Sequence, residues 1–450
     1  MRWILLVAPL AASTVAEAPT RARTPEGQYI SWKEHLVDDQ QLSGGVPLRG
    51  ADGLQMADLD KDGRLDIVSV HEDSSHVRLA FATADPDRWE LATLAEGGEA
   101  AAAEDASVGD LNRDGWPDIL VACELGHLIY FQNPGADATR RARWPRVIPE
   151  AARGRGSWIR AFFADLDRDG RLEVVAANKG EQLPSVGPGD TLSARHPKKE
   201  ISWFAPPPDP LDARGWKEHV LARVEIPINS QPVDLDGDGD LDILGGSRWQ
   251  ARCFWFENLG GRPARFREHA IEVTGRNVPW VRGEKRLTAF QVDFHDINRD
   301  GRLDLVMNED PTSLAWIEQP ARPGEPWRIH PIGTIAPDSP TGITIADING
   351  DGHADVITGG YSQNPRDRDG QNITTESSAG RLAWFENPRD PAGRWNRHDI
   401  SRTTRGMYDA FLARDLDGDG DLDFVATRGN SGNFDGVFWL EQVRTPAPVR

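Results

Sequence analysis

The sequence predicts an all-β protein, a seven-bladed β-propeller with an acidic loop between the first and second strand of each blade. Two observations support this prediction. An acidic nonapeptide, D-x-[DN]-x-D-G-x-x-[DE], occurs seven times, at spacings of 52, 55, 69, 62, 51 and 68 residues. Short apolar runs separated by turn residues follow each copy, without helical periodicity. Four such runs per repeat are typical of a propeller blade, and the repeat outweighs the several domains that a length of 450 residues would suggest.

The runs follow the acidic loop in a constant order. An apolar second strand such as "IVSV" at Ile67 comes first, then an apolar-aromatic third strand such as "CFWFEN" at Cys253. A fourth strand with an aromatic residue and often a histidine follows, as in "WKEHVL" at Trp216. The run before the next loop is the first strand of the next blade. We therefore expect residues 29–443 to form one propeller, preceded by a linker over 19–28 and followed by a tail over 444–450.

The two ends of the repeat array are complementary. A fourth-strand element, "WKEHLV" at Trp32, precedes the first acidic loop, and the last repeat ends after a third strand, "VFWLEQ" at Val437. The N-terminal strand should therefore complete the last blade and close the ring, which leaves no open seam of unpaired backbone groups.

The acidic loops have the composition of a cage for a hard cation. Positions 1, 3, 5 and 9 carry side-chain oxygens, and position 6 is always glycine, which permits a sharp turn. Ca²⁺ suits about six to eight flexible oxygen ligands, whereas Mg²⁺ retains waters and strict octahedral geometry. We expect up to seven structural Ca²⁺ ions, with an ion-free acidic turn as the alternative. The expected ligands are Asp58, Asp60, Asp62, Asp66; Asp110, Asn112, Asp114, Asp118; Asp165, Asp167, Asp169, Glu173; Asp234, Asp236, Asp238, Asp242; Asp296, Asn298, Asp300, Asp304; Asp347, Asn349, Asp351, Asp355; and Asp415, Asp417, Asp419, Asp423.

The net charge of −20 argues against nucleic acid and against an anionic membrane surface as partners. Acids fill 25 of the 28 loop ligand positions, and seven divalent ions would reduce the net charge to about −6. Metal binding therefore accounts for much of the acidity. Cys123 and Cys253 lie in different repeats, so we expect both to be free and buried. We expect a monomer without a membrane span.

The N-terminus resembles a secretory signal peptide over residues 1–18. Arg2 supplies a positive charge, Trp3 to Ala12 form an apolar run too short to span a bilayer, and Ala16-Glu17-Ala18 supplies small residues for cleavage. An uncleaved leader is the alternative. We expect an exported protein, located in the periplasm, at the cell surface or outside the cell.

These seven loops, together with the "WFEN" runs, resemble the FG-GAP or VCBS-repeat family over roughly Tyr29 to Val443. The resemblance implies a calcium-bearing seven-bladed propeller like the head of integrin α-chains, here in an exported bacterial form. Related secreted propellers occur in some carbohydrate lyases and in a sugar dehydratase, but fold alone does not fix function.

A ligand face is expected at the edge of the propeller opposite the acidic loops. Three long insertions fall on that edge, at Asn178–Glu200, Thr274–Leu287 and Gly360–Arg381. Polar residues at the ends of second strands and the starts of first strands should line the mouth of the channel there. The candidates are His71, Asp105, Glu124, Arg160, Lys179, Asn229, Arg248, Gln291, Glu309, Tyr361, Tyr408 and Arg428, with Glu72, Asn178, Asn308, Asp409 and Asn430 beside them.

One aromatic position recurs in most of the repeats. Tyr130, Trp203, Trp255, Trp316, Trp384 and Trp439 are equivalent in six blades, and Ala80 takes their place in the first. Stacking on sugars is one interpretation, but regular repetition favours packing between blades.

Two functions are consistent with these features. The first is a calcium-stabilised binding or scaffold module for carbohydrate or protein, which acts through the ligand face. The alternative is a carbohydrate-active enzyme, a lyase or dehydratase, which would use acids and a tyrosine on the same face. A paired acid and base in one pocket would favour the enzyme, and a flat, scattered rim would favour the binding module.

Overall fold

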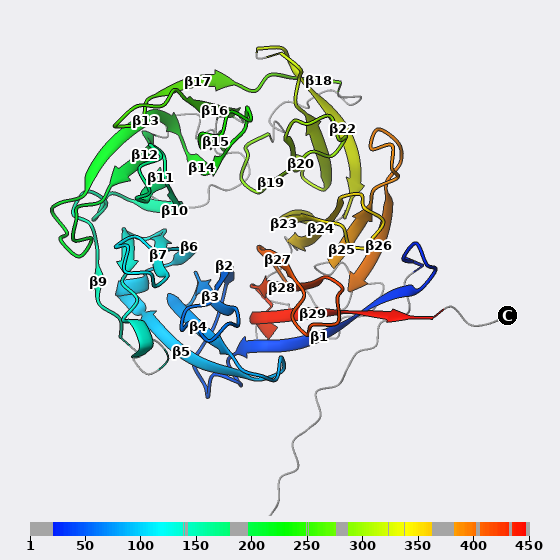
Figure 1. The fold of residues 1–450 in the computed structure, drawn as a ribbon, viewed down its shortest axis with the longest axis horizontal. Helices are drawn as coiled ribbons and strands as arrows, with labels where there is room; N and C mark the ends of the chain where they lie inside the picture. The colour runs from blue at the N-terminus through cyan, green and yellow to red at the C-terminus, as the bar shows by residue number, and fades with distance from the viewer. Residues whose placement is uncertain are drawn as a thin grey trace, which may run out of the picture.

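The computed structural model describes residues 21–137, 139, 143–180, 197–248, 250, 252–275, 287–322, 324–336, 338–361, 382–401, 406–431 and 434–446. These residues form seven antiparallel sheets arranged as a ring around a central channel (Figure 1). The fold is the all-β, seven-bladed propeller that the repeats predict. The first strand of each blade lines the channel and the fourth lies at the outside of the ring.

The first three blades take their strands in chain order from the channel outward. Blade 1 contains β2 (Ala51–Ala57), β3 (Asp66–His71), β4 (His76–Ala82) and β5 (Trp89–Glu96). Blade 2 contains β6 (Ala103–Gly109), β7 (Asp118–Cys123), β8 (Leu128–Phe131) and β9 (Arg146–Val147). Blade 3 contains β10 (Ser157–Ala164), β11 (Glu173–Gly180), β12 (Lys198–Ala205) and β13 (Lys217–Glu225). Two short 3₁₀ turns, η1 (Gly97–Ala100) and η2 (Gly135–Asp137), lie between strands of this half.

The next three blades repeat the pattern. Blade 4 contains β14 (Pro227–Val233), β15 (Asp242–Ser247), β16 (Arg252–Asn258) and β17 (Phe266–Ala270). Blade 5 contains β19 (Val292–His295), β20 (Asp304–Asp310), β21 (Ser313–Glu318) and β22 (Trp327–Thr334), and β18 (Val273–Thr274) adds a parallel fifth strand beside β22. Blade 6 contains β23 (Ser339–Ala346), β24 (Asp355–Tyr361), β25 (Leu382–Glu386) and β26 (Asn396–Ser401).

Blade 7 combines the two ends of the chain. Its first three strands are β27 (Phe411–Arg414), β28 (Asp423–Arg428) and β29 (Gly436–Thr445), and its outer strand is β1 (Tyr29–Asp39). β1 pairs antiparallel with β29 from Tyr29 opposite Thr445 to Asp39 opposite Gly436 (Figure 1). β29 therefore extends to Thr445, two residues beyond the expected boundary at 443.

A buried ion pair reinforces this junction. Arg428, at the end of β28, is 2% exposed, and its Nη1 donates to both carboxylate oxygens of Glu34 on β1, at 2.9 and 3.0 Å. Its Nε donates to the carbonyl oxygen of Phe434 at 2.7 Å. Arg428 therefore connects the N-terminal strand to the last blade.

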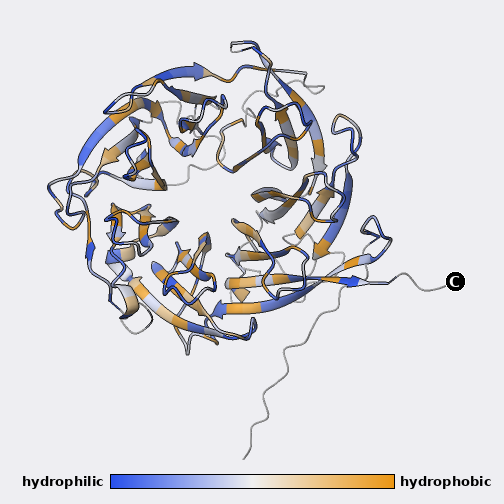
Figure 2. Cartoon of the chain, viewed as in Figure 1, coloured by the Kyte–Doolittle hydropathy of each residue, from blue (hydrophilic) through white to orange (hydrophobic). Residues whose placement is uncertain are grey.

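The core lies between neighbouring blades. Second and third strands are almost wholly buried, whereas outer strands such as β13 and β17 alternate or face water. Figure 2 shows hydrophobic residues inside the blades and mainly hydrophilic ones on the outer arcs of β13 and β17. Burial of these apolar faces is the main favourable contribution to the fold. Cys123 and Cys253 are both free and buried, as expected.

Side-chain amides join adjacent blades at a repeated position. An Asn or Gln at or near the end of the third strand donates from its amide nitrogen to the backbone carbonyl at position 2 of the preceding blade's acidic loop. This bond links Asn133 to Leu59, Asn258 to Leu166, Gln319 to Leu235 and Gln442 to Ile348, at 2.8–3.1 Å. We refer to these four bonds as the amide links.

The repeated tryptophans stack on histidines of the same blade in blades 3, 4, 5 and 7. Trp203 lies on His219 at 3.9 Å between ring centroids, and Trp316 lies on His330 at 4.1 Å, in both cases from the third to the fourth strand. The expected packing between blades is seen at Trp316, whose Nε1 donates to the carbonyl oxygen of Pro391 of the next blade at 3.0 Å.

Several expectations fall outside the described residues. The signal peptide over 1–18 and most of the three insertions belong to this group. Within the described ranges, no helix is long and apolar enough to cross a membrane.

Candidate functional site

Each acidic loop joins the first strand of its blade to the second, at the same edge of the ring. In blade 1, the Asp58 carboxylate at position 1 accepts the backbone N–H groups of Asp62 and Gly63, both at 3.0 Å. The Asp66 carboxylate at position 9 accepts the N–H groups of Leu59 and Ala82, at 2.8 and 2.9 Å. Position 9 therefore ties its own loop to the end of the third strand.

The backbone of the loop turns through the left-handed region twice. Position 6 is glycine in every loop, with φ between 79° and 94°, in agreement with the predicted sharp turn. Position 4 is also left-handed, as at Lys61 (φ 59°) and Arg299 (φ 61°), which costs free energy for a residue with a Cβ. Two such turns bend the chain around a common centre.

The side chains at that centre fit a hard cation. In four loops, three carboxylates each place an oxygen within 4.8 Å of the other two; the first members of these groups are Asp58, Asp165, Asp234 and Asp415. The Oδ1 atoms of Asp167 and Asp347 are buried and have no hydrogen-bond partner among the described residues. Burial raises the pKa of Asp66 to about 7 and that of Glu173 to about 7, with the neighbouring loop acids adding to the increase. A bound Ca²⁺ would supply the missing partner and favour the charged carboxylates.

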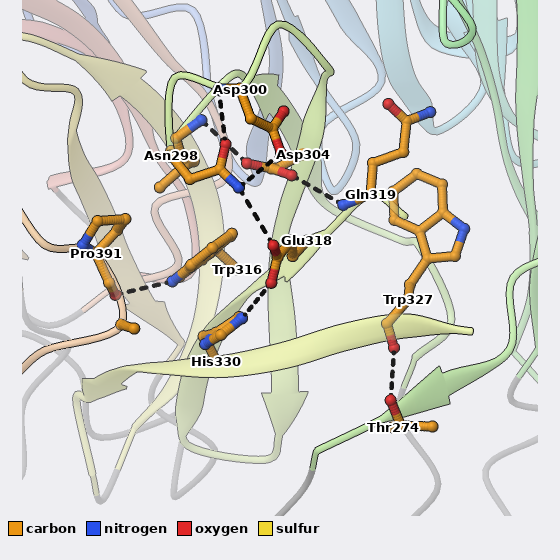
Figure 3. A network of polar contacts seen from close by, with 12 residues as sticks. Thr274, Asn298, Asp300, Asp304, Trp316, Glu318, Gln319, Trp327, His330 and Pro391 are labelled. Atoms are coloured by element: carbon orange, nitrogen blue, oxygen red, sulfur yellow. Dashed lines mark hydrogen bonds and ion pairs between the residues drawn. The ribbon is translucent and has the colours of Figure 1, made fainter. Parts of the chain in front are cut away.

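Beside the acidic loops lies a further carboxylate, which the sequence analysis did not identify. In blade 5, Asn298 donates to Asp300 at 3.0 Å and to Glu318 of β21 at 3.4 Å, while Glu318 also bonds His330 at 2.8 Å (Figure 3). Glu257, Glu386 and Glu441 hold the same position and the same histidine contact in blades 4, 6 and 7. The glutamate of the "WFEN" runs recurs in the sequence, and this recurrence could have identified it as a further candidate beside the loops.

The opposite edge of the ring contains a cavity of about 640 Å³ at the mouth of the channel. First strands begin at this edge and second strands end there, because the acidic loops occupy the other edge. A second cavity of about 340 Å³ lies deeper, along the first strands, and shares Phe290, Gln291 and Asp409 with the first. We refer to them as the mouth cavity and the channel cavity.

The structure brings together about half of the predicted ligand-face residues. Glu124, Lys179, Arg248, Gln291 and Tyr361 line the mouth cavity. Asp105 and Arg160 line the channel cavity. Glu309, at the end of β20, belongs to neither lining.

Four predicted residues lie inside the blades instead. His71 bonds Ser69 at 3.2 Å, and burial lowers its pKa to about 3. Asn229, 1% exposed, accepts the N–H of Ser230 at 2.8 Å. Tyr408 is fully buried against Phe438, and Arg428 pairs with Glu34 as described above. Their positions are a correction to the expected lining, because these side chains point into the core or toward β1.

Two acids of the mouth cavity were missed by the sequence analysis. Asp52 and Glu104 stand six residues before the first acid of their loops, as do Ile159, Phe290, Thr341 and Asp409, and all six line the mouth cavity. Asp105 and Arg160 stand five residues before the first acid of their loops, and both line the deeper channel cavity. Alignment of the seven repeats at this offset was the signal that could have found them.

Charge is unevenly distributed around the mouth. Asp409, Asp52, Glu72, Glu104 and Glu124 come from the consecutive blades 7, 1 and 2. The cations come from blades 3 and 4, as Lys179, Arg160 and Arg248. One side of the mouth is therefore acidic and the other basic.

Most of these groups have partners. Lys179 Nζ forms an ion pair with Glu124, and Arg160 Nη1 lies 3.6 Å from Asp105. Gln291 Nε2 donates to Asp409 Oδ1 at 3.2 Å. The guanidinium groups of Arg160 and Arg248 each lie 5.2 Å from the centre of the Phe290 ring, a cation–π arrangement.

Three acids of the mouth cavity have unusually high proton affinity. Burial, followed by repulsion from Glu104, raises the pKa of Asp52 well above its usual range. Burial and then repulsion from Glu124 raise the pKa of Glu104 well above its usual range and that of Glu72 to about 7. These three carboxyl groups therefore lie close together without enough positive charge to stabilise them.

Comparison with known proteins identifies the repeats. The model of the FG-GAP-like repeat family matches residues 58–121, 110–176, 234–307 and 296–358, more than half of the chain. No curated protein sequence matches this chain. Among solved structures, a crystal structure of BBS1N in complex with ARL6DN, soaked with lead, has a TM-score of 0.47 and 9% identity over 92% of this chain and 98% of that one. The same complex soaked with mercury has a TM-score of 0.47 and 9% identity over 89% and 94%.

Proposed function

This chain belongs to the FG-GAP-like repeat family, and from that premise we propose that it binds a carbohydrate in the mouth cavity, on the edge opposite its acidic loops. The fold is that of a binding or scaffold module. The observation that carries the choice of ligand is the cavity itself, about 640 Å³ and lined by convergent polar groups. Such a volume is typical of small-molecule sites, whereas protein partners usually bind flatter surfaces.

The lining favours a sugar that carries a carboxylate. Arg248, on the basic side, has an exposed side chain and can donate from a planar fork to a carboxylate. Tyr361 and Asn308 add hydroxyl and amide groups that suit sugar hydroxyls. Phe290 supplies an apolar ring face, which packs well against the C–H face of a pyranose.

Binding of soluble oligosaccharides tests this proposal. We expect an array that contains neutral and uronate-containing glycans to show binding to the latter, followed by titration calorimetry on the best ligand. Arg248→Ala should weaken that binding by about 1–3 kcal/mol, the usual contribution of a charged hydrogen bond. Arg214→Ala is the matched control, because Arg214 is 82% exposed and pairs with Glu150 far from the mouth cavity. Binding of a protein and no glycan, or equal affinity of both variants and the parent, would contradict the proposal.

We further propose that Ca²⁺ occupies the acidic loops and stabilises the blades. The support is the left-handed turn at position 6, the clustered carboxylates and the unpartnered Oδ1 atoms of Asp167 and Asp347. Arg2 and the apolar run after it support export. The N-terminal sequence of the protein recovered from a secreting host would show whether residues 1–18 are removed.

One observation favours a carbohydrate-active enzyme as the second candidate. Carboxyl groups, Lys179 and Tyr361 line one concave cavity rather than a scattered rim, which is the arrangement that acid–base chemistry on a sugar requires. Incubation with uronate polysaccharides, followed by the ultraviolet absorbance of unsaturated products, distinguishes a lyase from a binding module. Tyr361→Phe should abolish such an activity while leaving binding measurable.

A further inference from the structure

Three carboxylates from two blades converge on the acidic side of the mouth cavity. Asp52 comes from the start of β2, Glu72 directly follows β3, and Glu104 lies in β6. One oxygen of each lies within 4.8 Å of the other two, and all three residues line the cavity. We refer to these residues as the mouth triad. It lies at the edge of the ring opposite the acidic loops.

The mouth triad lacks the compensation that its neighbours have. Glu124 is paired with Lys179, Asp105 with Arg160, and Asp409 accepts a hydrogen bond from Gln291. None of the three triad residues forms an ion pair with another described residue. Lys179 attracts Glu72 and Glu104 from nearby, but it is already paired with Glu124, and three adjacent carboxylates would still repel one another strongly in a partly buried site.

Asp52 provides an independent observation. It is 2% exposed, and both of its carboxylate oxygens are buried without any hydrogen-bond partner in the described part of the chain. Burial of a polar group without a partner costs several kcal/mol, and the cost is larger for a charged group. Asp52 lines the cavity, so an ion held between the three carboxylates would supply the partner that its oxygens lack.

The dimensions suit one class of ion. Ca²⁺ binds oxygen at about 2.3–2.6 Å, so two ligands on opposite sides of it lie up to about 5 Å apart, whereas Mg²⁺ at about 2.1 Å draws them to about 4 Å. Oxygens that all lie within 4.8 Å of one another can surround Ca²⁺, and the flexible coordination of Ca²⁺ suits side chains from two blades better than the strict octahedron of Mg²⁺. A set made only of carboxylates also selects hard cations over zinc, which takes nitrogen and sulfur ligands more often.

We propose that Asp52, Glu72 and Glu104 bind a divalent hard cation, Ca²⁺ in preference to Mg²⁺, at the mouth of the channel. The ion joins blade 1 to blade 2 and neutralises part of the acidic side. Three protein ligands leave several coordination positions open toward the cavity. A further role of the ion, which rests on the proposed function, is to bind a hydroxyl or carboxylate of the sugar directly while Arg248 binds its other end.

Metal binding without any sugar tests the site. Crystals of the full chain soaked in MnCl₂ should show an anomalous peak between the three carboxylates, in addition to any peaks in the acidic loops. Equilibrium dialysis against ⁴⁵Ca²⁺ then counts the ions bound per chain. Asp52→Asn and Glu104→Gln should each bind one ion fewer than the parent, because each removes a ligand with little change in shape. Asp73→Asn is the matched control, because it removes an exposed charge next to Glu72 and should keep the full count.

The outcomes are distinct. No anomalous peak at the mouth triad, when peaks are present in the loops, overturns the proposal, as does an unchanged count in both variants with a native circular dichroism spectrum. An increase in the melting temperature of Asp52→Asn with an unchanged count would show that the triad is a set of protonated acids. If the ion binds but no sugar does, the metal site stands and the proposed function fails.

Discussion

Loss of the Arg428–Glu34 ion pair should destabilise the whole ring. Arg428→Ala removes a side chain that is 2% exposed, together with the hydrogen bonds to both Glu34 oxygens and to the carbonyl oxygen of Phe434. Breaking a buried pair costs about 3–5 kcal/mol, and the lower end applies here because the Glu34 side chain is 36% exposed and can be hydrated. We therefore expect a loss of about 3 kcal/mol in the free energy of unfolding.

The effect on melting follows from the size of the propeller. With an unfolding entropy of about 2.1 cal/mol/K per residue, a domain of roughly 400 residues loses about 1 °C of melting temperature per kcal/mol. Differential scanning calorimetry should therefore show Arg428→Ala melting about 3 °C below the parent. Arg414→Ala, on the neighbouring strand β27 but exposed, should change the free energy by less than about 0.5 kcal/mol.

A double-mutant cycle isolates the pair. Glu34→Ala, Arg428→Ala and the double variant should show an interaction free energy above about 0.5 kcal/mol, since the two residues are in direct contact. Additive effects, or an Arg428→Ala protein that melts with the parent, would refute the view that this pair fastens β1 to blade 7. Weaker ligand binding with unchanged melting would instead restore Arg428 to the ligand face, where the sequence analysis placed it.

Three further predictions concern the loops, the terminal strand and the thiols. In the metal-free protein, the raised pKa of Asp66, Asp242 and Asp304, each about 7 through burial, means that the folded state binds more protons than the unfolded state. The stability that these three groups contribute should therefore be fully present below about pH 4 and be lost as the pH rises through 7. Added Ca²⁺ should offset this loss, so melting temperatures in EDTA and in CaCl₂ should diverge as the pH rises. Melting temperatures that keep a constant difference across this pH range would contradict calcium binding by these carboxylates. Deletion of residues 29–38 removes the outer strand of blade 7 and should abolish cooperative melting, and a truncated protein that melts like the parent would disprove a stabilising role for β1. Cys123 and Cys253 are buried, which raises the pKa of each thiol to about 12, so neither should react with a thiol reagent until the protein unfolds, and rapid labelling of the native protein would contradict their burial.

The repeats made the architecture predictable, because a motif that occurs seven times fixes the number of blades and the place of each loop. Residues at the mouth were harder to predict. First strands carry register shifts near their starts, for example between Ala51 and Leu54 and between Ala103 and Asp105. A shift of one residue reverses which side chain faces the channel, so an expected alternation fails there. Asp52 and Glu104 were missed for this reason.

Contacts between distant segments were beyond the reach of a sequence pattern. Arg428 stands at a strand end like Arg248, yet Glu34 lies beside it only because the N-terminal strand joins the last blade. Lys179 and Glu124 likewise come from two blades. The polarity of the mouth was predictable from composition, but the pairing of its charges depends on the closed ring.

The amide links give the ring a direction. Each runs from the third strand of one blade back to the acidic loop of the blade before it, as from Gln319 to Leu235, while the Asp304 carboxylate of the same blade accepts the backbone N–H of Gln319. Disturbance of one loop is thereby transmitted to its own third strand and from there to the loop behind. In an open array, such a chain of contacts would end at a terminal repeat that feels only one neighbour. Here the last blade adjoins the first through a different bond, from Thr427 Oγ1 to the carbonyl oxygen of Asp52 at 3.1 Å, so every blade has two neighbours and none can be removed without mismatching the blades on either side of the gap.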